Sequence, residues 1–321
     1  MRNYFFLLLI LFAILSCGND YKEAEDIEKI NINFDVERFD MAFANAAPKD
    51  LQRLKKAYPF MFSENFKDSF WIAKMEDSIQ RELLEQTTNR FQNLKPEKKD
   101  IEGLFKHLKY FFPDFKTPRV ITTTSTVDYR NKIIVTDTIV LVSLDTYLGT
   151  DHYFYEGIQD FIKKDMKPEY LVVDLANKYA EEYIFQSDRR TLLDEFIYAG
   201  KKMYFKDKVI PFKTDAEKIG YTDAELDWAE KNEEYIWRYF VDRELLFSTD
   251  SKLPNRFINS APFSKFYLEE IDNESPARIG QYIGWQIVKS YMDQNQEVTF
   301  QQMLNKSTED IFNNTKFKPR K

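Results

Sequence analysis

The chain has 321 residues, with 46 Lys and Arg against 53 Asp and Glu, and its formal net charge is −7. No basic run offsets this acidity, so we expect no nucleic-acid partner. The single cysteine excludes an intramolecular disulfide. Aromatic residues make up 16% of the chain and glycine contributes only 8 residues, a composition that favours one sizeable, helix-rich core.

The N-terminus has the features of a bacterial lipoprotein signal. One positive charge, Arg2, precedes an apolar run at 4–15, which is too short to span a bilayer and has the length of a signal-peptide core. The run ends in the letters ILSC, a pattern typical of lipoproteins that are cut before the cysteine and acylated on its thiol. We therefore predict a lipoprotein signal peptide at 1–16 and lipidation of Cys17. The alternative is a plain signal peptide that happens to contain a cysteine.

Acyl chains on Cys17 would hold the protein on a membrane, because two or more chains on one residue give stable anchoring. Gly18, the next residue, favours the outer membrane, with the protein facing the periplasm or the cell surface. Residues 17–30 are polar and acid-rich without periodicity, which predicts a flexible tether. The acidic cluster in it is alternatively a surface-export signal. We expect a single domain at 31–321.

The patterns after the tether predict an α+β fold that is mostly helical, with a small sheet packed against several helices. Strands are expected where side chains alternate or β-branched residues dominate, at 31–39, 119–126 and 132–144, the last being one long strand or a pair. Helices are expected where apolar residues recur at helical spacing, at 70–91, 100–112, 168–186, 188–205, 222–247, 277–294 and 299–312.

Local signals mark several helix starts. Asp100 is expected to cap the helix that follows it. Thr222-x-x-Glu225 and Thr299-x-x-Gln302 are capping boxes, in which each side chain bonds to the backbone N–H of the other residue. These patterns predict helix starts at the two threonines.

Helix 188–205 carries Asp194-Glu195-x-x-Tyr198. With histidines at 194 and 198 it would be the H-E-x-x-H motif, in which two imidazoles one turn apart hold zinc and the glutamate activates the metal-bound water. A carboxylate and a phenol stand there instead, and a phenol with a pKa near 10 makes a weak zinc ligand. The pattern also suits an ordinary buried amphipathic helix. We predict a vestigial cleft at these three residues, with no catalytic residue, metal or cofactor.

Two histidines and two glycines are further site candidates. His107 and His152 are 45 residues apart, and neither has a second histidine at helical spacing. His152 lies among aromatic residues, which predicts a structural or solvent-facing role, although a tyrosine-rich loop is also typical of partner-binding surfaces. Gly280 and Gly284 share one helical face and predict close approach of a second helix. Alternatively, they open room beside the cleft.

Four segments, NFDVERFD, IVLVSLDTYLG, LLDEFIYAGKKMYF and SPARIGQYIGWQIVKSYM, follow the ILSC signal in this order. Together they resemble the gliding motility-associated lipoprotein GldB family of Bacteroidota, across essentially the whole mature chain. The resemblance implies a role in gliding motility and the linked type IX secretion machinery, with other gliding or secretion proteins as partners. That family is similar to zinc-dependent proteases with an intact H-E-x-x-H, which implies a zincin-like domain at 31–321. This chain keeps only Glu195 of that motif.

Our first interpretation is a non-catalytic, lipid-anchored protein that acts through protein contacts in gliding motility. A second is a zinc-dependent peptidase with atypical ligands near Glu195. A third, based on the aromatic richness of the chain, is a glycan- or small-molecule-binding lipoprotein that reuses the vestigial cleft.

Overall fold

The computed structural model describes residues 22–185 and 190–320, so the signal peptide at 1–16 and Cys17 lie outside the described residues. Its sheet has four strands in the order β1-β2-β4-β3. Strands β1, β2 and β4 are parallel, and β3 pairs antiparallel with β4 at the edge. Their bounds are β1 Val36–Arg38, β2 Arg119–Thr123, β3 Ile133–Val135 and β4 Ile139–Ser143.

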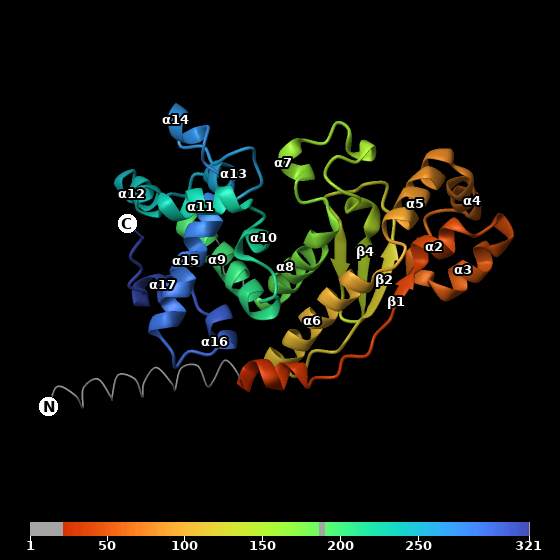
Figure 1. The fold of residues 1–321 in the computed structure, drawn as a ribbon, viewed down its shortest axis with the longest axis horizontal. Coiled ribbons are helices and arrows are strands. Elements are labelled where there is room, and N and C mark those ends of the chain that lie inside the picture. The colour runs from red at the N-terminus through yellow and green to blue at the C-terminus, as the bar shows by residue number, and fades with distance from the viewer. Residues whose placement is uncertain (1–21, 186–189, 321) are drawn as a thin grey trace.

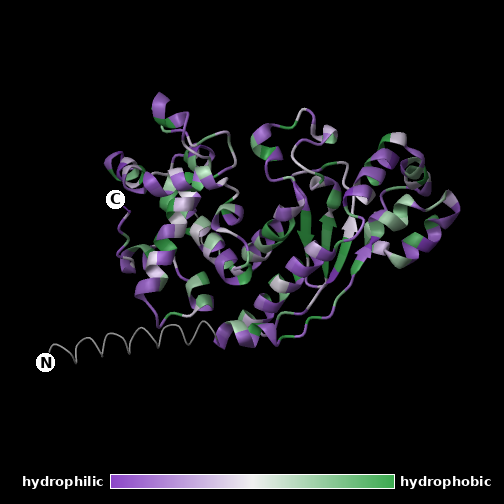
Figure 2. Ribbon diagram, viewed as in Figure 1, coloured by the Kyte–Doolittle hydropathy of each residue, from purple (hydrophilic) through white to green (hydrophobic). Residues whose placement is uncertain are grey.

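Helices cover both faces of the sheet, because alternate side chains of each strand point to opposite faces. Val120 of β2 belongs to the main core, whereas its neighbour Ile121 belongs to a second, smaller core. Figure 1 shows the helices of the small core at one end of the sheet, and Figure 2 shows strands with strongly hydrophobic stretches. The helices of the small core are α2 Phe39–Ala44, α3 Leu51–Ala57, α4 Asp68–Glu76 and α5 Ser78–Arg90. Helices α6 Lys95–Phe111 and α8 Leu171–Tyr183 contribute to the main core.

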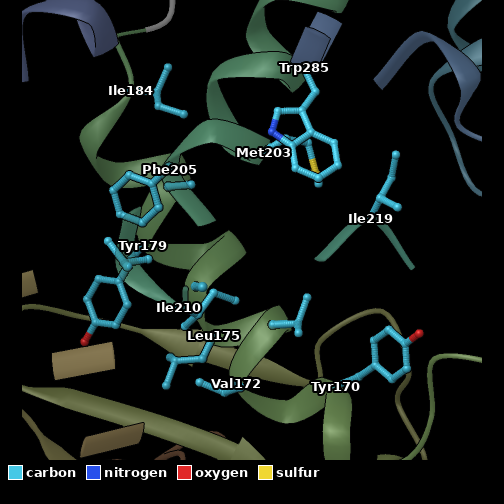
Figure 3. Close-up of a cluster of buried hydrophobic side chains, with 14 of the residues drawn as sticks. Tyr170, Val172, Leu175, Tyr179, Ile184, Met203, Phe205, Ile210, Ile219 and Trp285 are labelled. Atoms are coloured by element: carbon cyan, nitrogen blue, oxygen red, sulfur yellow. The ribbon is translucent and has the colours of Figure 1, made fainter. Parts of the chain in front are cut away.

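The main core continues from the sheet into a helical C-terminal part. Its centre is the pair α9 Leu192–Val209 and α15 Ile279–Gln294. Figure 3 shows Met203 and Phe205 of α9 near Trp285 of α15 and Tyr179 of α8. Further helices are α7 Asp160–Lys163, α10 Asp215–Ile219, α11 Asp223–Lys231, α12 Glu233–Asp242, α13 Leu253–Phe257, α14 Glu269–Asp272, α16 Phe300–Leu304 and α17 Thr308–Asn314.

Glycines allow α9 and α15 to touch backbone to backbone. A Cβ added to Gly284 would lie 1.8 Å from the carbonyl oxygen of Phe196, and one added to Gly200 would lie 2.1 Å from the carbonyl oxygen of Gly284. A Cβ on Gly280 would meet the Phe196 ring at 2.4 Å. The predicted close approach at Gly280 and Gly284 is therefore confirmed, and Gly200 is its partner on the facing helix.

Several helices that we expected to be continuous are split. The expected helix 70–91 breaks at Asp77, whose carboxylate accepts a hydrogen bond from the N–H of Gln80 at 2.7 Å and starts α5. Asn232 separates α11 from α12, and Ser307 caps α17 after the end of α16. The apolar periodicity runs through these breaks, so periodicity alone did not reveal them.

Two local predictions about helix starts are confirmed and one is wrong. Both capping boxes form, at Thr222 with Glu225 and at Thr299 with Gln302. The expected cap at Asp100 is wrong, because α6 begins five residues earlier, with a proline in its first turn. Asp100 instead makes an ion pair with Lys213 at 3.0 Å.

The strands are shorter than predicted. The expected strand 31–39 is reduced to the three residues of β1, and 132–144 is a pair of strands, β3 and β4. The α+β, mostly helical fold class is confirmed. Likeness to a zincin stays a prediction.

The described part of the expected tether is folded. Residues 22–28 form a helix, and Ile27 in it is only 5% exposed. Its acidic side chains reach lysines of two other helices, with Glu23 at 3.7 Å from Lys208 of α9 and Glu28 at 3.5 Å from Lys106 of α6. The tether prediction missed this because it took the acidic residues as solvated. Within the described ranges, no helix is both long and apolar enough to cross a membrane.

Candidate functional site

Asp194 supports the start of α9. Its Oδ2 accepts hydrogen bonds from the backbone N–H of Arg190 at 3.0 Å and from the N–H and hydroxyl of Thr191, both at 2.8 Å. The Thr191 hydroxyl in turn accepts from the Asp194 N–H, completing a capping box. Burial raises the pKa of Asp194, but hydrogen bonds from Thr191, Thr308 and the Arg190 backbone outweigh this and lower it. This carboxylate thus bonds to the helix start.

The other two residues of the predicted vestigial cleft are half-buried on the same helix. Tyr198 has the Lys202 ammonium at 5.2 Å from its ring centroid, and Glu195 lies one turn before it. The helix that packs on edge strand β3 is α8, whereas α9 packs on α15, α8, α6 and α17. The vestigial cleft at Asp194, Glu195 and Tyr198 stays a prediction.

Neither histidine joins these residues. The Nδ1 of His107 lies 2.7 Å from the carbonyl of Gly103 one turn earlier, and burial lowers its pKa. His152 caps a short turn, where its Nδ1 accepts from the N–H of Phe154 at 3.3 Å. Across residues 22–185 and 190–320, no group of three or more His, Cys, Asp or Glu is placed to hold a metal ion.

A different surface has the features of a binding site. An apolar groove of about 490 Å³ runs between α12 and the segment 266–271. We call it the apolar groove; its lining is Trp228, Asn232, Tyr235, Ile236, Arg238, Tyr239, Asp242, Arg243, Phe266, Leu268 and Ile271. Large apolar side chains stay exposed along it, with Tyr235 64%, Leu268 39% and Ile271 37% accessible. Contiguous exposed apolar surface of this kind marks interaction sites.

Specific hydrogen bonds fix the conformation of the groove wall at 266–271. The carboxylate of Asp272 accepts from the N–H of Phe266 at 2.6 Å and from the N–H of Tyr267 at 3.0 Å. Tyr267 adopts a left-handed backbone conformation with φ of 62°, which is unfavourable for a bulky residue. Such strained conformations are concentrated at functional sites. The Tyr239 hydroxyl donates to the carbonyl of Phe266 at 2.8 Å and ties this wall to α12. The segment is therefore fixed in a conformation that exposes its apolar side chains.

Cationic side chains lie against the tyrosines beside the groove. The guanidinium of Arg243 is 4.9 Å from the ring of Tyr239, and those of Arg238 and Arg256 are 5.2 Å and 4.5 Å from the rings of Tyr235 and Tyr267. Arg243 and Arg256 have no acidic side chain within 4.0 Å among the residues that the structure describes. Tyr, Trp and Arg are the residue types enriched at protein interfaces. The groove thus offers apolar contact beside the guanidinium groups of Arg243 and Arg256, and Asp242 also lines it.

Sequence reasoning missed the groove, and it overlooked one signal for Asp194. The stretch 228–243 carries aromatic residues on more than one face of its helices, more than a core-facing stripe needs. For Asp194, the spacing Thr191-x-x-Asp194 is the same kind of capping pattern that we identified at Thr222 and Thr299.

Comparison with known families gives one match. The family described as Gliding motility protein GldB matches residues 20–319 of the chain. No curated protein and no solved structure matches it. The match covers nearly the whole chain, so the protein belongs to the gliding motility protein GldB family, whose description names no enzymatic activity.

Proposed function

We propose that this member of the GldB family is a non-catalytic, lipid-anchored protein that acts in gliding motility by binding another protein in the apolar groove. The family ties the chain to gliding motility. The inference of a lipid anchor depends on Cys17, which lies just before the start of the family match at residue 20. The observation that carries the proposal is the groove itself, with exposed Tyr235, Leu268 and Ile271 around an apolar floor.

The occupant that fits the groove is a protein segment with large apolar side chains flanked by acidic residues. The volume of about 490 Å³ accommodates a few such side chains. Arg243 and Arg256 supply positive charge next to the tyrosines, and acidic flanks on the partner would pair with them. The partner is another gliding or type IX secretion protein.

The bonding of Asp194 supports a non-catalytic reading of α9. Its Oδ2 already accepts three hydrogen bonds at the start of a helix, so a metal ion would have to bind the other oxygen or displace these bonds. The competing hypothesis, a zinc peptidase with atypical ligands near Glu195, predicts about one equivalent of zinc per chain by elemental analysis. Our proposal predicts no stoichiometric zinc in the purified protein.

A matched pair of substitutions tests the groove. Ile271→Asp places a charge on the groove wall, in the first turn of α14. Ile79→Asp makes the same change at a residue that is 60% exposed, in the first turn of α5 within the other part of the molecule. An acidic residue is favourable in the first turn of a helix, so both variants should fold.

We expect cells carrying Ile271→Asp to lose gliding and cells carrying Ile79→Asp to glide normally, at equal protein levels. Normal gliding with Ile271→Asp would refute the groove as the working surface. Equal loss in both variants would show that the effect is not specific to the groove.

A further inference from the structure

A second, polar pocket lies beside α9, with Lys202 and Lys206 of that helix in its lining. It has a volume of about 190 Å³, several times the ~30 Å³ that one water takes in the liquid. Side chains from α8, α9, the end of α10 and the start of α15 converge on it. We call it the polar pocket; the residues that carry the argument are Asp165, Asp174, Asn177, Lys206 and Arg278.

One side of the polar pocket is cationic. Lys206 is only 6% exposed, and its ammonium donates to the carbonyl of Lys218 at 2.7 Å and contacts Met203 Sδ at 3.7 Å. No carboxylate lies within 4.0 Å of it among the described residues. An ammonium has three donors, so this group keeps bonding capacity. The Arg278 guanidinium adds a second positive charge, paired with Asp165 at 2.7 Å.

The other side of the polar pocket carries hydrogen-bond acceptors. Asp174 of α8 uses one oxygen, Oδ2, to accept from Lys132 at 2.8 Å and from the Tyr147 hydroxyl at 2.9 Å. Its second oxygen accepts no hydrogen bond from the described residues, and the side chain is 32% exposed. Asn177 donates through Nδ2 to Glu181 at 3.1 Å, which leaves its carbonyl oxygen as an acceptor. The buried Oδ1 of Asp165 also has no hydrogen-bond partner.

A buried ammonium without a carboxylate partner, as at Lys206, and a buried carboxylate oxygen without a donor, as at Asp165 Oδ1, are each costly, because burial removes the water that would solvate them. Their presence in one pocket indicates a ligand with complementary groups. A simple anion would complement Lys206 but would face Asp174 unfavourably, and a simple cation would do the reverse.

We propose that the polar pocket binds a small zwitterion with a carboxylate and an ammonium group, such as a free amino acid. The carboxylate accepts from Lys206 in the field of Arg278, and the ammonium donates to Asp174 and Asn177. This site is independent of the apolar groove and of the proposed docking function. It also differs from the predicted vestigial cleft, because Asp194, Glu195 and Tyr198 do not line it.

Protonation of Lys206 should be linked to this binding. Burial, together with the positive charges of Lys202 and Arg278, lowers its pKa to about 7, while Asp174 and Asp165 act in the opposite direction. The ammonium of Lys218, which also lines the pocket, is turned toward Asp207 at 2.9 Å. A carboxylate bound beside Lys206 favours its charged form and raises its pKa. Binding at pH 7.5 therefore takes up a proton.

Calorimetric titration of the full chain in detergent tests the proposal, with glycine, acetate and methylamine as probes. We expect saturable glycine binding, with acetate and methylamine weaker by about tenfold or more, because each lacks one charge-assisted hydrogen bond. Repeating the glycine titration in buffers of different ionisation enthalpy should reveal proton uptake.

Two lysine variants distinguish a loss of binding at the polar pocket from a general effect on the protein. Lys206→Met removes the ammonium and keeps most of the side-chain volume. Lys201→Met is the matched control, because Lys201 is 4% exposed on the same helix, donates to the carbonyls of Leu304 and Lys306, and does not line the pocket. We expect about tenfold or greater loss of glycine affinity in the first variant and no change in the second. No saturable glycine binding at millimolar concentration, or equal loss in both variants, would overturn the proposal.

Discussion

Replacing Gly284 with alanine tests the contact between α9 and α15 most sharply. The added Cβ would lie 1.8 Å from the carbonyl oxygen of Phe196, about 1.6 Å short of the 3.4 Å at which ordinary contact begins. The obstructing atom is backbone, so relief requires the two helices to move apart. Alanine gains about 1 kcal/mol in helix propensity, whereas overpacking in a core costs about 1–3 kcal/mol and more when backbone must shift. We expect a net loss of about 2 kcal/mol or more in the free energy of unfolding.

Gly103→Ala is the matched control, because Gly103 also lies inside a helix, α6. Its Cβ would meet the ring of Phe212 at 2.8 Å, and Phe212 is half exposed and free to turn aside. This variant should unfold at the wild-type temperature or slightly above it. The assay is thermal unfolding followed by circular dichroism at fixed pH and detergent concentration. An unfolding midpoint for Gly284→Ala at or above that of the wild type would refute the close packing of these helices.

Three further outcomes follow from single side chains. Asp194→Ala should lower stability by about 1 kcal/mol in urea unfolding, because the start of α9 loses the hydrogen bonds that the Asp194 carboxylate accepts, and an unchanged midpoint would contradict that role. Glu195→Gln should leave gliding intact, whereas abolished gliding would favour catalysis. The folded pKa of Lys206, about 7, lies below its unfolded value near 10.4, so the unfolded chain binds more protons between these pH values. Stability of the wild type relative to Lys206→Met should rise from pH 7 to 9 by up to about 1.4 kcal/mol per pH unit, and parallel pH profiles would contradict this.

Local patterns in the sequence predicted the helix-rich architecture because they act within a few residues. The capping boxes at Thr222 and Thr299 form as predicted, since each depends on bonds across three residues. The order of strands depends on pairing across long distances, such as Val36 with Val120, and no local pattern specifies it. The breaks at Asp77 and Asn232 escaped notice because the apolar periodicity continues through them.

The candidate sites were harder to predict, because each is made by segments far apart in the chain. The apolar groove joins α12 to residues 266–271, and the polar pocket joins Asp165 to Arg278, which are 113 positions apart. The motif at Asp194 drew attention through its likeness to a zinc helix. Its geometry instead follows from the hydrogen bonds at the start of α9, which the neighbouring Thr191 makes possible.

Site-specific photo-cross-linking in gliding cells tests the docking claim most directly. A photoreactive phenylalanine analogue would replace Tyr235, which is 64% exposed and lines the apolar groove, or Ile79 as the control. The account predicts one discrete cross-linked protein from position 235 and none from position 79. No product at position 235, or the same products at both positions, would contradict it.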